Sequence, residues 1–503
     1  EKEQTYIPIE KIIELFVDDI YSGFKVKSKN IIKITRDADF DIDKDDVADL
    51  LKEVETNIKR MHQRDVIKLE YEKGLPTKIL NTIIAKNKFK KKETFEIHGI
   101  LNLNDLIELY NKIDSSELKD EQISPIIPTE FYDGNIFDQI KKKDFLFFHP
   151  YQSYQPIIDL INTAADDPNV LAIKQLLYRT SSNSPIINAL IRAAENGKYV
   201  TVIVEVTARF DEKRNIEWTK KLQNAGAHVI YGIADLKTHA KALLIIRKEN
   251  NTITKYIHLA TGNYNEITAK LYTDLSFFTS DTTYGEDISI LFNLLTGFSM
   301  PDVFNRISVA PLDLRKNFLF LIERETENAK KGIKAKIIAK MNSLNDAEIV
   351  KALYNASMAG VKIELIVRGI CILRPNLKKI SQNIKVKSIV GQFLEHARIF
   401  YFYNGGDEEY YLSSADWMSR NLDKRIEILF PIKSEENKKF IAEILKIQLA
   451  DEQNSWYLDE TGAYKKHIKK HENNPKNYFK EIYSFIKKGE KKNKKTKLKL
   501  FSL

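Results

Sequence analysis

The feature that most constrains the fold of this chain is a pattern that occurs twice along it. In each copy a helix ends at a glycine, two strands follow, and a histidine two residues before a basic residue precedes a hairpin. Gly197 and His239 mark the first copy, 42 positions apart, and Gly360 and His396 mark the second, 36 positions apart. Alternating helices and strands are typical of parallel or mixed α/β sheets. The pattern therefore predicts two similar α/β domains that arose by internal duplication.

Apolar runs bounded by turn residues predict the strands of both copies. The polar turns at 249–251 and 404–407 predict the two hairpins. We expect strands of the first copy at 170–178, 200–206, 228–232, 240–247 and 255–260, and strands of the second at 361–367, 384–390, 399–403 and 409–412.

The stretch before about residue 130 has a different pattern. Residues 31–35 and 66–71 have strand character, and residues 44–61 have the periodicity of an amphipathic helix. We therefore expect a small α+β head domain at 1–130, then α/β domains at 131–306 and 307–503.

Composition limits the classes of protein that need to be considered. With 43% hydrophobic residues among 503, the chain has enough apolar surface for several packed cores. Its single cysteine, Cys371, favours a reducing, cytoplasmic setting. The net charge of +9 suits a polyanionic partner, whether nucleic acid, acidic lipid or polyphosphate. The eight lysines at 487–499 predict a solvated, disordered basic tail, and the sequence gives no further support for membrane contact through it.

Each copy places a histidine and a cation at the start of a strand. His239 precedes Lys241 by two positions, and His396 precedes Arg398 by two. Because alternate residues of a strand face the same side, each imidazole lies beside a cation that can neutralise phosphate. Small polar clusters follow both hairpins, at 261–265 and 413–416 in the sequence. A single histidine of this kind is more often structural, but two in matched contexts indicate one two-histidine site.

This arrangement resembles the phospholipase D-like superfamily, in which two such half-sites face each other across a pseudo-two-fold axis. The resemblance implies two phospholipase D-like α/β domains. Longer segments then resemble one family, the polyphosphate kinases, in the family's order. They are 148–154 (FHPYQSY), 171–174 (LAIK), 178–179 (YR), 208–212 (ARFDE), 236–241 (LKTHAK), 271–274 (LYTD), 367–369 (VRG), 394–396 (LEH) and 411–422 (YLSSADWMSRNL).

The family resemblance implies reversible transfer of the γ-phosphate of ATP to inorganic polyphosphate, with Mg²⁺ accompanying ATP. It implies that His239 becomes phosphorylated and that His396 is the second active-site histidine. Oligomers of identical chains are also implied. By the same resemblance, Tyr272, Arg368 and His396 contact ATP, Lys241 and Arg398 are placed to bind phosphate, and Arg179 and Arg209 lie beside the Mg²⁺-bound phosphates without ligating the metal directly.

The family also carries an N-terminal helical domain that adds an asparagine near the nucleotide. The chain begins at Glu1 without an initiator methionine, so we expect a fragment that lacks this domain.

The residue types suit phosphoryl transfer. A neutral imidazole attacks phosphorus without a separate base, and arginine presents a planar fork to phosphate oxygens. The sequence has neither a Walker A pattern nor a kinase glycine-rich loop, so side chains have to hold the nucleotide.

Two other interpretations use the same residues. A phospholipase D-type phosphodiesterase acting on lipid or nucleic acid would use both histidines, although Arg398 stands where such hydrolases have lysine. A catalytically inactive polyanion-binding module would need neither His239 nor His396. We expect ATP, ADP and polyphosphate rather than nucleic acid as partners.

Overall fold

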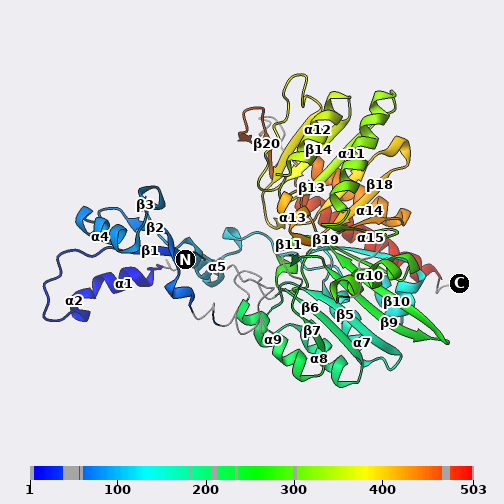
Figure 1. Ribbon diagram of the computed structural model, residues 1–503, viewed down its shortest axis with the longest axis horizontal. Coiled ribbons are helices and arrows are strands. Elements are labelled where there is room, and N and C mark those ends of the chain that lie inside the picture. The colour runs from blue at the N-terminus through cyan, green and yellow to red at the C-terminus, as the bar shows by residue number, and fades with distance from the viewer. Residues whose placement is uncertain are drawn as a thin grey trace. The chain divides into compact units, whose positions relative to one another are not determined.

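The computed structural model (Figure 1) describes residues 5–37, 56, 60–181, 183–205, 212–232, 236–297, 303–466 and 476–500. The chain divides into two compact units, Glu1–Gln122 and Ile123–Leu503, and each is described by itself.

The first unit is built on a small sheet. In it β2 (Val66–Glu72) pairs antiparallel with β1 (Ile32–Arg36) and parallel with β3 (Thr94–Ile97). The two strands predicted for this region are confirmed, whereas the helix predicted at 44–61 lies almost entirely outside the described residues. The helices of the unit are α1 (Ile9–Leu15), α2 (Val17–Ile20), α4 (Thr77–Asn87) and α5 (Leu106–Lys112), with 3-10 turns at Met61–Gln63, Lys91–Glu93, Leu103–Asp105 and Ser116–Leu118.

The first half of the second unit is a mixed sheet in the order β11-β10-β9-β5-β6-β7. β5, β6 and β7 run parallel, and β9, β10 and β11 form antiparallel neighbours beside them. Its strands are β4 (Phe145–His149), which pairs with β11, β5 (Val170–Leu177), β6 (Tyr199–Val204), β7 (His228–Ile230), β9 (Ala242–Glu249), β10 (Thr252–Ala260) and β11 (Tyr272–Thr279); its helices are α6 (Ile136–Lys142), α7 (Gln155–Asp166), α8 (Pro185–Glu195), α9 (Glu212–Asn224) and α10 (Thr282–Leu295).

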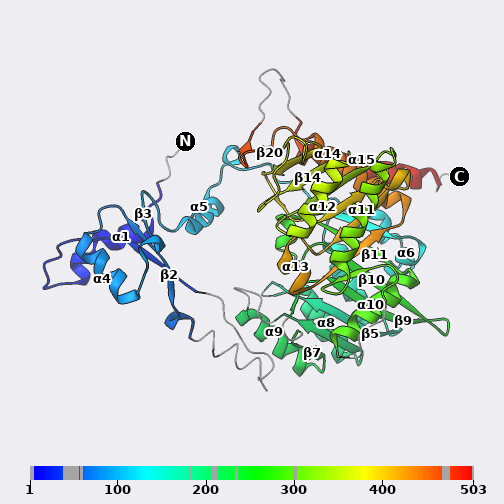
Figure 2. The same ribbon diagram turned by 45° about the horizontal axis from the view of Figure 1, so that its top comes forward.

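The second half repeats this order as β19-β18-β17-β13-β14-β15 and extends it by β20 and β21. Figure 2 shows α11 and α12 side by side on this half. Its strands are β12 (Ser308–Ala310), β13 (Lys336–Met341), β14 (Lys362–Val367), β15 (Ile384–Ile389), β17 (Ile399–Phe402), β18 (Glu409–Ser413), β19 (Arg425–Ile432), β20 (Ser455–Leu458) and β21 (Tyr464–Lys465); its helices are α11 (Leu314–Lys330), α12 (Ala347–Met358), α13 (Ser419–Asp423), α14 (Glu435–Ala450) and α15 (Tyr478–Leu500).

The duplication predicted from the sequence is confirmed by this shared strand order. In each half, three parallel strands are followed by an antiparallel hairpin and a further antiparallel strand. The fold class is therefore the expected one, a small α+β unit followed along the chain by two similar α/β domains.

Local sequence explains where the matching helices begin and end. The Asp346 carboxylate caps α12 by accepting a hydrogen bond from the backbone N–H of Ile349 at 3.1 Å. Pro185 opens α8, where its missing N–H has no helical partner to lose. Gly197 and Gly360 follow the two helices with φ of +79° and +104°, a conformation that other residues rarely adopt.

The two halves exchange short strands. β8 (Lys237–Thr238), just before His239, pairs in parallel with β19 of the second half. β16 (Leu394–Glu395), just before His396, pairs in parallel with β11 of the first half. Each histidine thus directly follows a short strand that pairs with the sheet of the other half.

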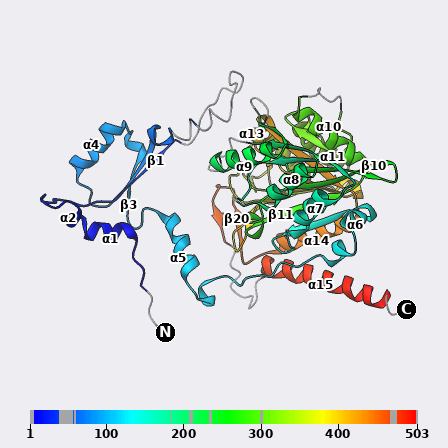
Figure 3. The same cartoon turned by 90° about the horizontal axis from the view of Figure 1, so that it is seen from below.

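One hydrophobic core continues through both halves. The rings of Phe277 on β11 and Phe430 on β19 stack with centroids 5.9 Å apart. Helices α14 and α15, which run next to each other (Figure 3), add apolar side chains such as Ile444 and Ile482 to the same core. The shared core fixes the two halves relative to each other.

The expectation of a disordered tail at 487–499 is wrong, because α15 runs through to Leu500. Tyr478, Ile482 and Ile486, spaced by four residues, are buried in the shared core. This apolar stripe anchors the helix before the lysine-rich run at 487–499. Among the helices of the described residues, none combines the length and hydropathy that crossing a bilayer requires.

We predict that Phe430→Ala lowers the free energy of unfolding by about 3–5 kcal/mol, because it leaves a cavity where the halves meet. Phe320→Ala is the matched control, since Phe320 is 64% exposed, and should change stability by less than about 0.5 kcal/mol. Chemical denaturation of both variants measures the difference. Equal midpoints for the two variants would contradict a core shared by the halves.

Candidate active site

His239 lies in the turn between β8 and β9 and is 7% exposed. The backbone N–H groups of His239 and Ala240 both donate to the Ile426 carbonyl, at 2.9 and 2.8 Å. The backbone of the histidine is therefore held by β19 of the other half.

The imidazole of His239 is held by a buried carboxylate. Its Nδ1 lies 2.8 and 2.9 Å from the two oxygens of Glu427, which is fully buried. Burial lowers the pKa of His239 well below its ordinary value, and the cations of Lys241 and Arg425 lower it further. The ring is thus neutral, and with Glu427 ionised its Nδ1–H donates to the carboxylate while Nε2 keeps its lone pair. Burial also raises the pKa of Glu427 to about 7.

His396 is held in the same way by the first half. Its Nδ1 lies 2.9 and 2.8 Å from the oxygens of Asp274 on β11. Burial and the nearby Arg398 lower the pKa of His396 to about 4. Burial opposes ionisation of Asp274, yet His396 and Arg398 hold its pKa below the ordinary value. His396 is therefore also neutral, and its Nε2 accepts from Arg398 Nη1 at 3.1 Å.

The two carboxylates occupy equivalent positions. Arg425 and Ile426 pair with β8, and Glu427 comes next; Tyr272 and Thr273 pair with β16, and Asp274 comes next. Sequence reasoning missed both carboxylates as site residues. A signal existed in hindsight, since each lies on the antiparallel strand that follows the hairpin of its own half, but only the exchange of strands shows which histidine it faces.

The cations predicted to bind phosphate lie at the histidines. Lys241 is 1% exposed, its Nζ donates to the His239 carbonyl, and burial lowers its pKa to about 7. Arg398 donates to the His396 carbonyl at 2.8 Å and to Asp416 at 3.2 Å. Lys241 lowers the pKa of His396, and Arg398 that of His239, so the two half-sites form one electrostatic centre.

Tyr272 and Arg368 join the same centre. The Tyr272 ring lies 5.4 Å from that of His396. Arg368 directly follows β14, and its pKa is lowered by burial and by Arg398. The three residues expected at the nucleotide, Tyr272, Arg368 and His396, are thus brought together.

Arg179 is connected to the first histidine through the ring of Tyr178, whereas Arg209 is outside the described residues. The Arg179 guanidinium lies 5.4 Å from the ring centroid of Tyr178. That ring meets His239 edge-on at 5.0 Å. Sequence reasoning also missed Arg425, whose Nη1 lies 3.6 Å from Glu427.

Within the part of the chain that the structure describes, no group of three or more histidine, cysteine, aspartate or glutamate side chains is placed to hold a metal ion. The described cations at this centre are arginines and a lysine, which do not ligate Mg²⁺.

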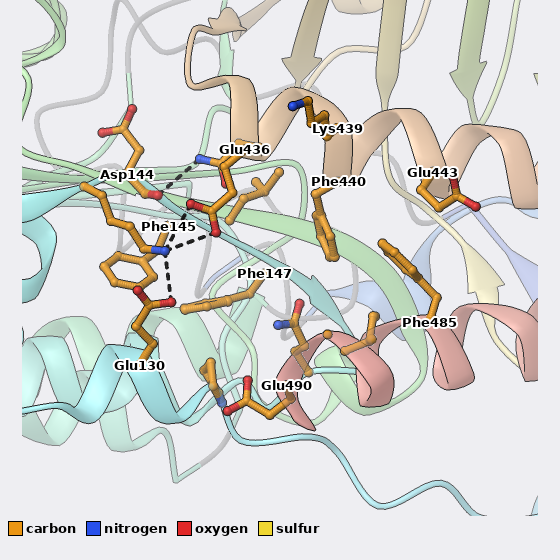
Figure 4. Close-up of a pocket in the computed structure, with 17 residues that line it drawn as sticks. Glu130, Asp144, Phe145, Phe147, Glu436, Lys439, Phe440, Glu443, Phe485 and Glu490 are labelled. Atoms are coloured by element: carbon orange, nitrogen blue, oxygen red, sulfur yellow. Dashed lines mark hydrogen bonds and ion pairs between the residues drawn. The ribbon is translucent and has the colours of Figure 1, made fainter. Parts of the chain in front are cut away.

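A cavity of about 480 Å³ lies elsewhere, between β4, α14 and α15 (Figure 4). Its walls include the rings of Phe145 and Phe485, and at its edge Lys143 bridges Glu130 at 2.9 Å and Glu436 at 3.1 Å. The residues described as lining it include neither of the two histidines. The chemistry of the histidine pair therefore resides in the composite centre rather than in this cavity.

Two halves of one topology, each supplying a carboxylate to the histidine of the other half, define a duplicated α/β protein with a single composite site. Comparison with known proteins narrows this class. Family models match in order along the chain: "Polyphosphate kinase middle domain" at residues 1–109, "Polyphosphate kinase C-terminal domain 1" at 135–301 and "Polyphosphate kinase C-terminal domain 2" at 307–478.

Relatives agree with the family models. The chain is 48% identical over 467 residues to the polyphosphate kinase of Halalkalibacterium halodurans, covering 92% of this chain and 66% of that protein. It is 44% identical over 469 residues to that of Bacillus anthracis, with the same two coverages of 92% and 66%. The crystal structure of polyphosphate kinase from Porphyromonas gingivalis superposes with a TM-score of 0.83 at 33% identity, covering 96% of this chain and 71% of that one.

The chain therefore belongs to the polyphosphate kinase family. It spans just under two thirds of the length of these two curated relatives, 66% in each case.

We predict that the neutral state of His396 makes the fold acid-sensitive. Below pH 6.5 the unfolded imidazole binds a proton that the folded one, with a pKa of about 4, does not, so stability falls as pH falls from 6.5 to 4. At about 1.4 kcal/mol per pKa unit, the contribution lost is about 3 kcal/mol.

Denaturant midpoints measured at several pH values for wild type and His396→Gln test this. The variant should lose less stability over that window, and the exposed His98→Gln should follow wild type. Parallel curves for wild type and His396→Gln would contradict the assignment.

Proposed function

We propose that this chain forms the catalytic part of an enzyme that transfers the γ-phosphate of ATP reversibly to inorganic polyphosphate through a phosphohistidine at His239. The observation that carries the proposal is the neutral, buried His239, whose Nδ1–H is committed to Glu427 while Nε2 keeps its lone pair among cations. Membership in the polyphosphate kinase family supports the choice of substrates.

The first step forms a nitrogen–phosphorus bond. Nε2 of His239 attacks the γ-phosphorus, and the bond from that phosphorus to the bridging oxygen of the departing ADP breaks. The ring then carries positive charge, which Glu427 stabilises through the Nδ1–H hydrogen bond. In the second step a terminal oxygen of polyphosphate attacks the phosphorus and the nitrogen–phosphorus bond breaks. Attack by ADP instead reverses the first step.

The cations around His239 can neutralise the negative charge of the transferred phosphoryl group. Lys241, Arg398 and Arg425 all lie close enough to lower the pKa of His239, so an anionic phosphoryl group there meets positive charge from both halves. Arg179 and Arg209 are proposed to lie near the Mg²⁺ that enters with ATP. A cytoplasmic location and oligomers of identical chains belong to the same proposal.

His396 and its neighbours are proposed to hold the nucleotide. Tyr272 offers a ring and a hydroxyl, and Arg368 offers a partly desolvated guanidinium beside Arg398. His396 is fixed by Asp274 through Nδ1, and the approach of anionic phosphates favours protonation of its Nε2, which then donates a hydrogen bond to the charge that develops on the departing ADP.

We predict that incubation with Mg-ATP adds one acid-labile phosphoryl group, and that His239→Ala abolishes it. Intact-protein mass spectrometry at neutral to alkaline pH, before and after brief acid treatment, measures the gain. The exposed His228→Ala is the control and should label as wild type does. Cleavage of a phosphodiester without ADP formation would instead support the phospholipase D-type alternative. Equal labelling of His239→Ala would end the proposal.

We predict that Glu427→Gln slows phosphorylation of His239 by about 10²- to 10⁴-fold, because an amide cannot stabilise the charged ring as a carboxylate does. Rapid-quench measurement of the acid-labile product gives the rate. Glu435→Gln on the surface of α14 is the matched control and should keep the wild-type rate. A Glu427→Gln rate within about threefold of wild type would remove Glu427 from the mechanism.

A further inference from the structure

Glu395 is a buried carboxylate directly before His396, and it lies at the meeting point of elements from both halves. It is 2% exposed and ends β16. Its oxygens contact Lys340 Nζ of β13 at 2.9 Å, Tyr478 Oη of α15 at 2.8 Å, Gln448 Nε2 of α14 at 3.1 Å and Thr273 Oγ1 of β11 at 3.2 Å.

Two of these partners, Thr273 and Lys340, also form hydrogen bonds with the backbone at His396 and Ala397. On one side, the His396 N–H donates to Thr273 Oγ1 at 3.2 Å, and this hydroxyl lies against Glu395. On the other side, Lys340 Nζ donates to the Ala397 carbonyl at 3.1 Å while paired with Glu395. The carboxylate therefore connects through one intermediary each to the N–H of His396 and to the carbonyl of the next residue, Ala397.

The fold does not require this ion pair, because the first half is built without it. Thr238 pairs with β19 as Glu395 pairs with β11, so it occupies the equivalent position before His239. Lys340 lies opposite Ile399, three residues after His396. The equivalent position in the first half is the residue opposite Ala242, which lies three residues after His239. Gln175 pairs with Leu243, so the next pair of the same register sets Leu176 opposite Ala242. A threonine and a leucine thus replace the charged pair there.

Stability alone is also a weak reason for burying two charges. Desolvation of a buried ion pair offsets much of its attraction, and apolar replacements are often no less stable. The Glu395–Lys340 pair instead holds the backbone around His396 in place. Glu395 also connects that backbone to α14 and α15.

We propose that Glu395, acting through Lys340 and Thr273, is a positioning residue that sets where the His396 imidazole meets the nucleotide phosphates. This inference rests on the proposed function and adds a residue that acts through His396. A displacement of about 1 Å at such a group costs up to about 10²-fold in rate.

The test uses Glu395→Gln, Lys340→Met and the double variant in steady-state assays of ADP formation. Both single variants should lower kcat by about 10- to 100-fold while KM for Mg-ATP changes by less than about threefold. The double variant should lose far less than the product of the two losses, because both residues act as one unit.

Lys387→Met is the matched control. Lys387 is a 4% exposed lysine on the neighbouring strand β15, and its Nζ donates to the carbonyls of Leu449 at 2.9 Å and Asp451 at 3.2 Å. Its loss should lower the thermal midpoint and leave kcat within about twofold. If all the variants lose kcat only in proportion to their loss of folded protein, the positioning role is overturned.

A second readout does not depend on activity. In protein labelled with ¹⁵N-histidine, the Nδ1–H signal of His396 is assigned by its absence in His396→Gln. It should shift or broaden in Glu395→Gln and Lys340→Met but stay unchanged in Lys387→Met. An unchanged signal in all of them overturns the inference even if wild type forms no ADP. Absence of ADP and of phosphohistidine in wild type, with the signal shifted as expected, would reject the proposed function alone.

Discussion

The parallel pairing of β8 with β19 and of β16 with β11 is the constraint on which the composite site depends. Each pairing inserts the two residues before a histidine into the sheet of the opposite half. The next residue of that sheet strand is Glu427 in one case and Asp274 in the other, and each accepts from the incoming imidazole. Neither half can therefore form a complete histidine–carboxylate pair by itself. The shared apolar core, with Phe277 stacked on Phe430, keeps the two exchanges in register.

Burial gives this centre its chemical character. An imidazole in water is partly protonated near pH 6.5, but His239 and His396 are desolvated and surrounded by cations, so both are held neutral. The carboxylates select the tautomer by accepting from Nδ1. The same burial lowers the pKa of Lys241 to about 7. Burial thus concentrates these charged and titratable groups where water screens them little, so each strongly affects the pKa of the others.

The halves share a topology but differ at equivalent positions beside the two histidines. Tyr272 and Arg425 hold matching places on β11 and β19, so a ring faces one histidine where a guanidinium faces the other. Glu395 and Thr238 also hold matching places. Beside His396, Glu395 forms an ion pair with Lys340, whereas the first half has Thr238 and Leu176 at these two positions. Such asymmetry is what a site needs if one half is to take the phosphoryl group and the other the nucleotide.

The sequence by itself determined the elements and the duplication, because these are local properties. Helix ends at Gly197 and Gly360 follow from backbone conformations that glycine adopts freely, and the hairpins follow from short polar turns between apolar runs. The motif pair His239–Lys241 and His396–Arg398 was visible as a repeated spacing. The expectation that each motif lies on a strand is wrong, because these residues lie in the turns that lead from β8 to β9 and from β16 to β17. The prediction of a disordered basic tail was wrong because it rested on the lysines alone. The apolar side chains of α15 pack against core residues that lie far away in the sequence, and the local pattern does not show this.

Only the tertiary structure decided which groups meet. Glu427 is 188 positions from His239 and Asp274 is 122 from His396, and nothing in the neighbouring sequence shows which histidine each carboxylate faces. Their partnership depends on strands exchanged between halves, which is a matter of long-range pairing. The neutral state of both histidines was likewise beyond the sequence, since desolvation comes from the surrounding packed chain rather than from neighbouring residues.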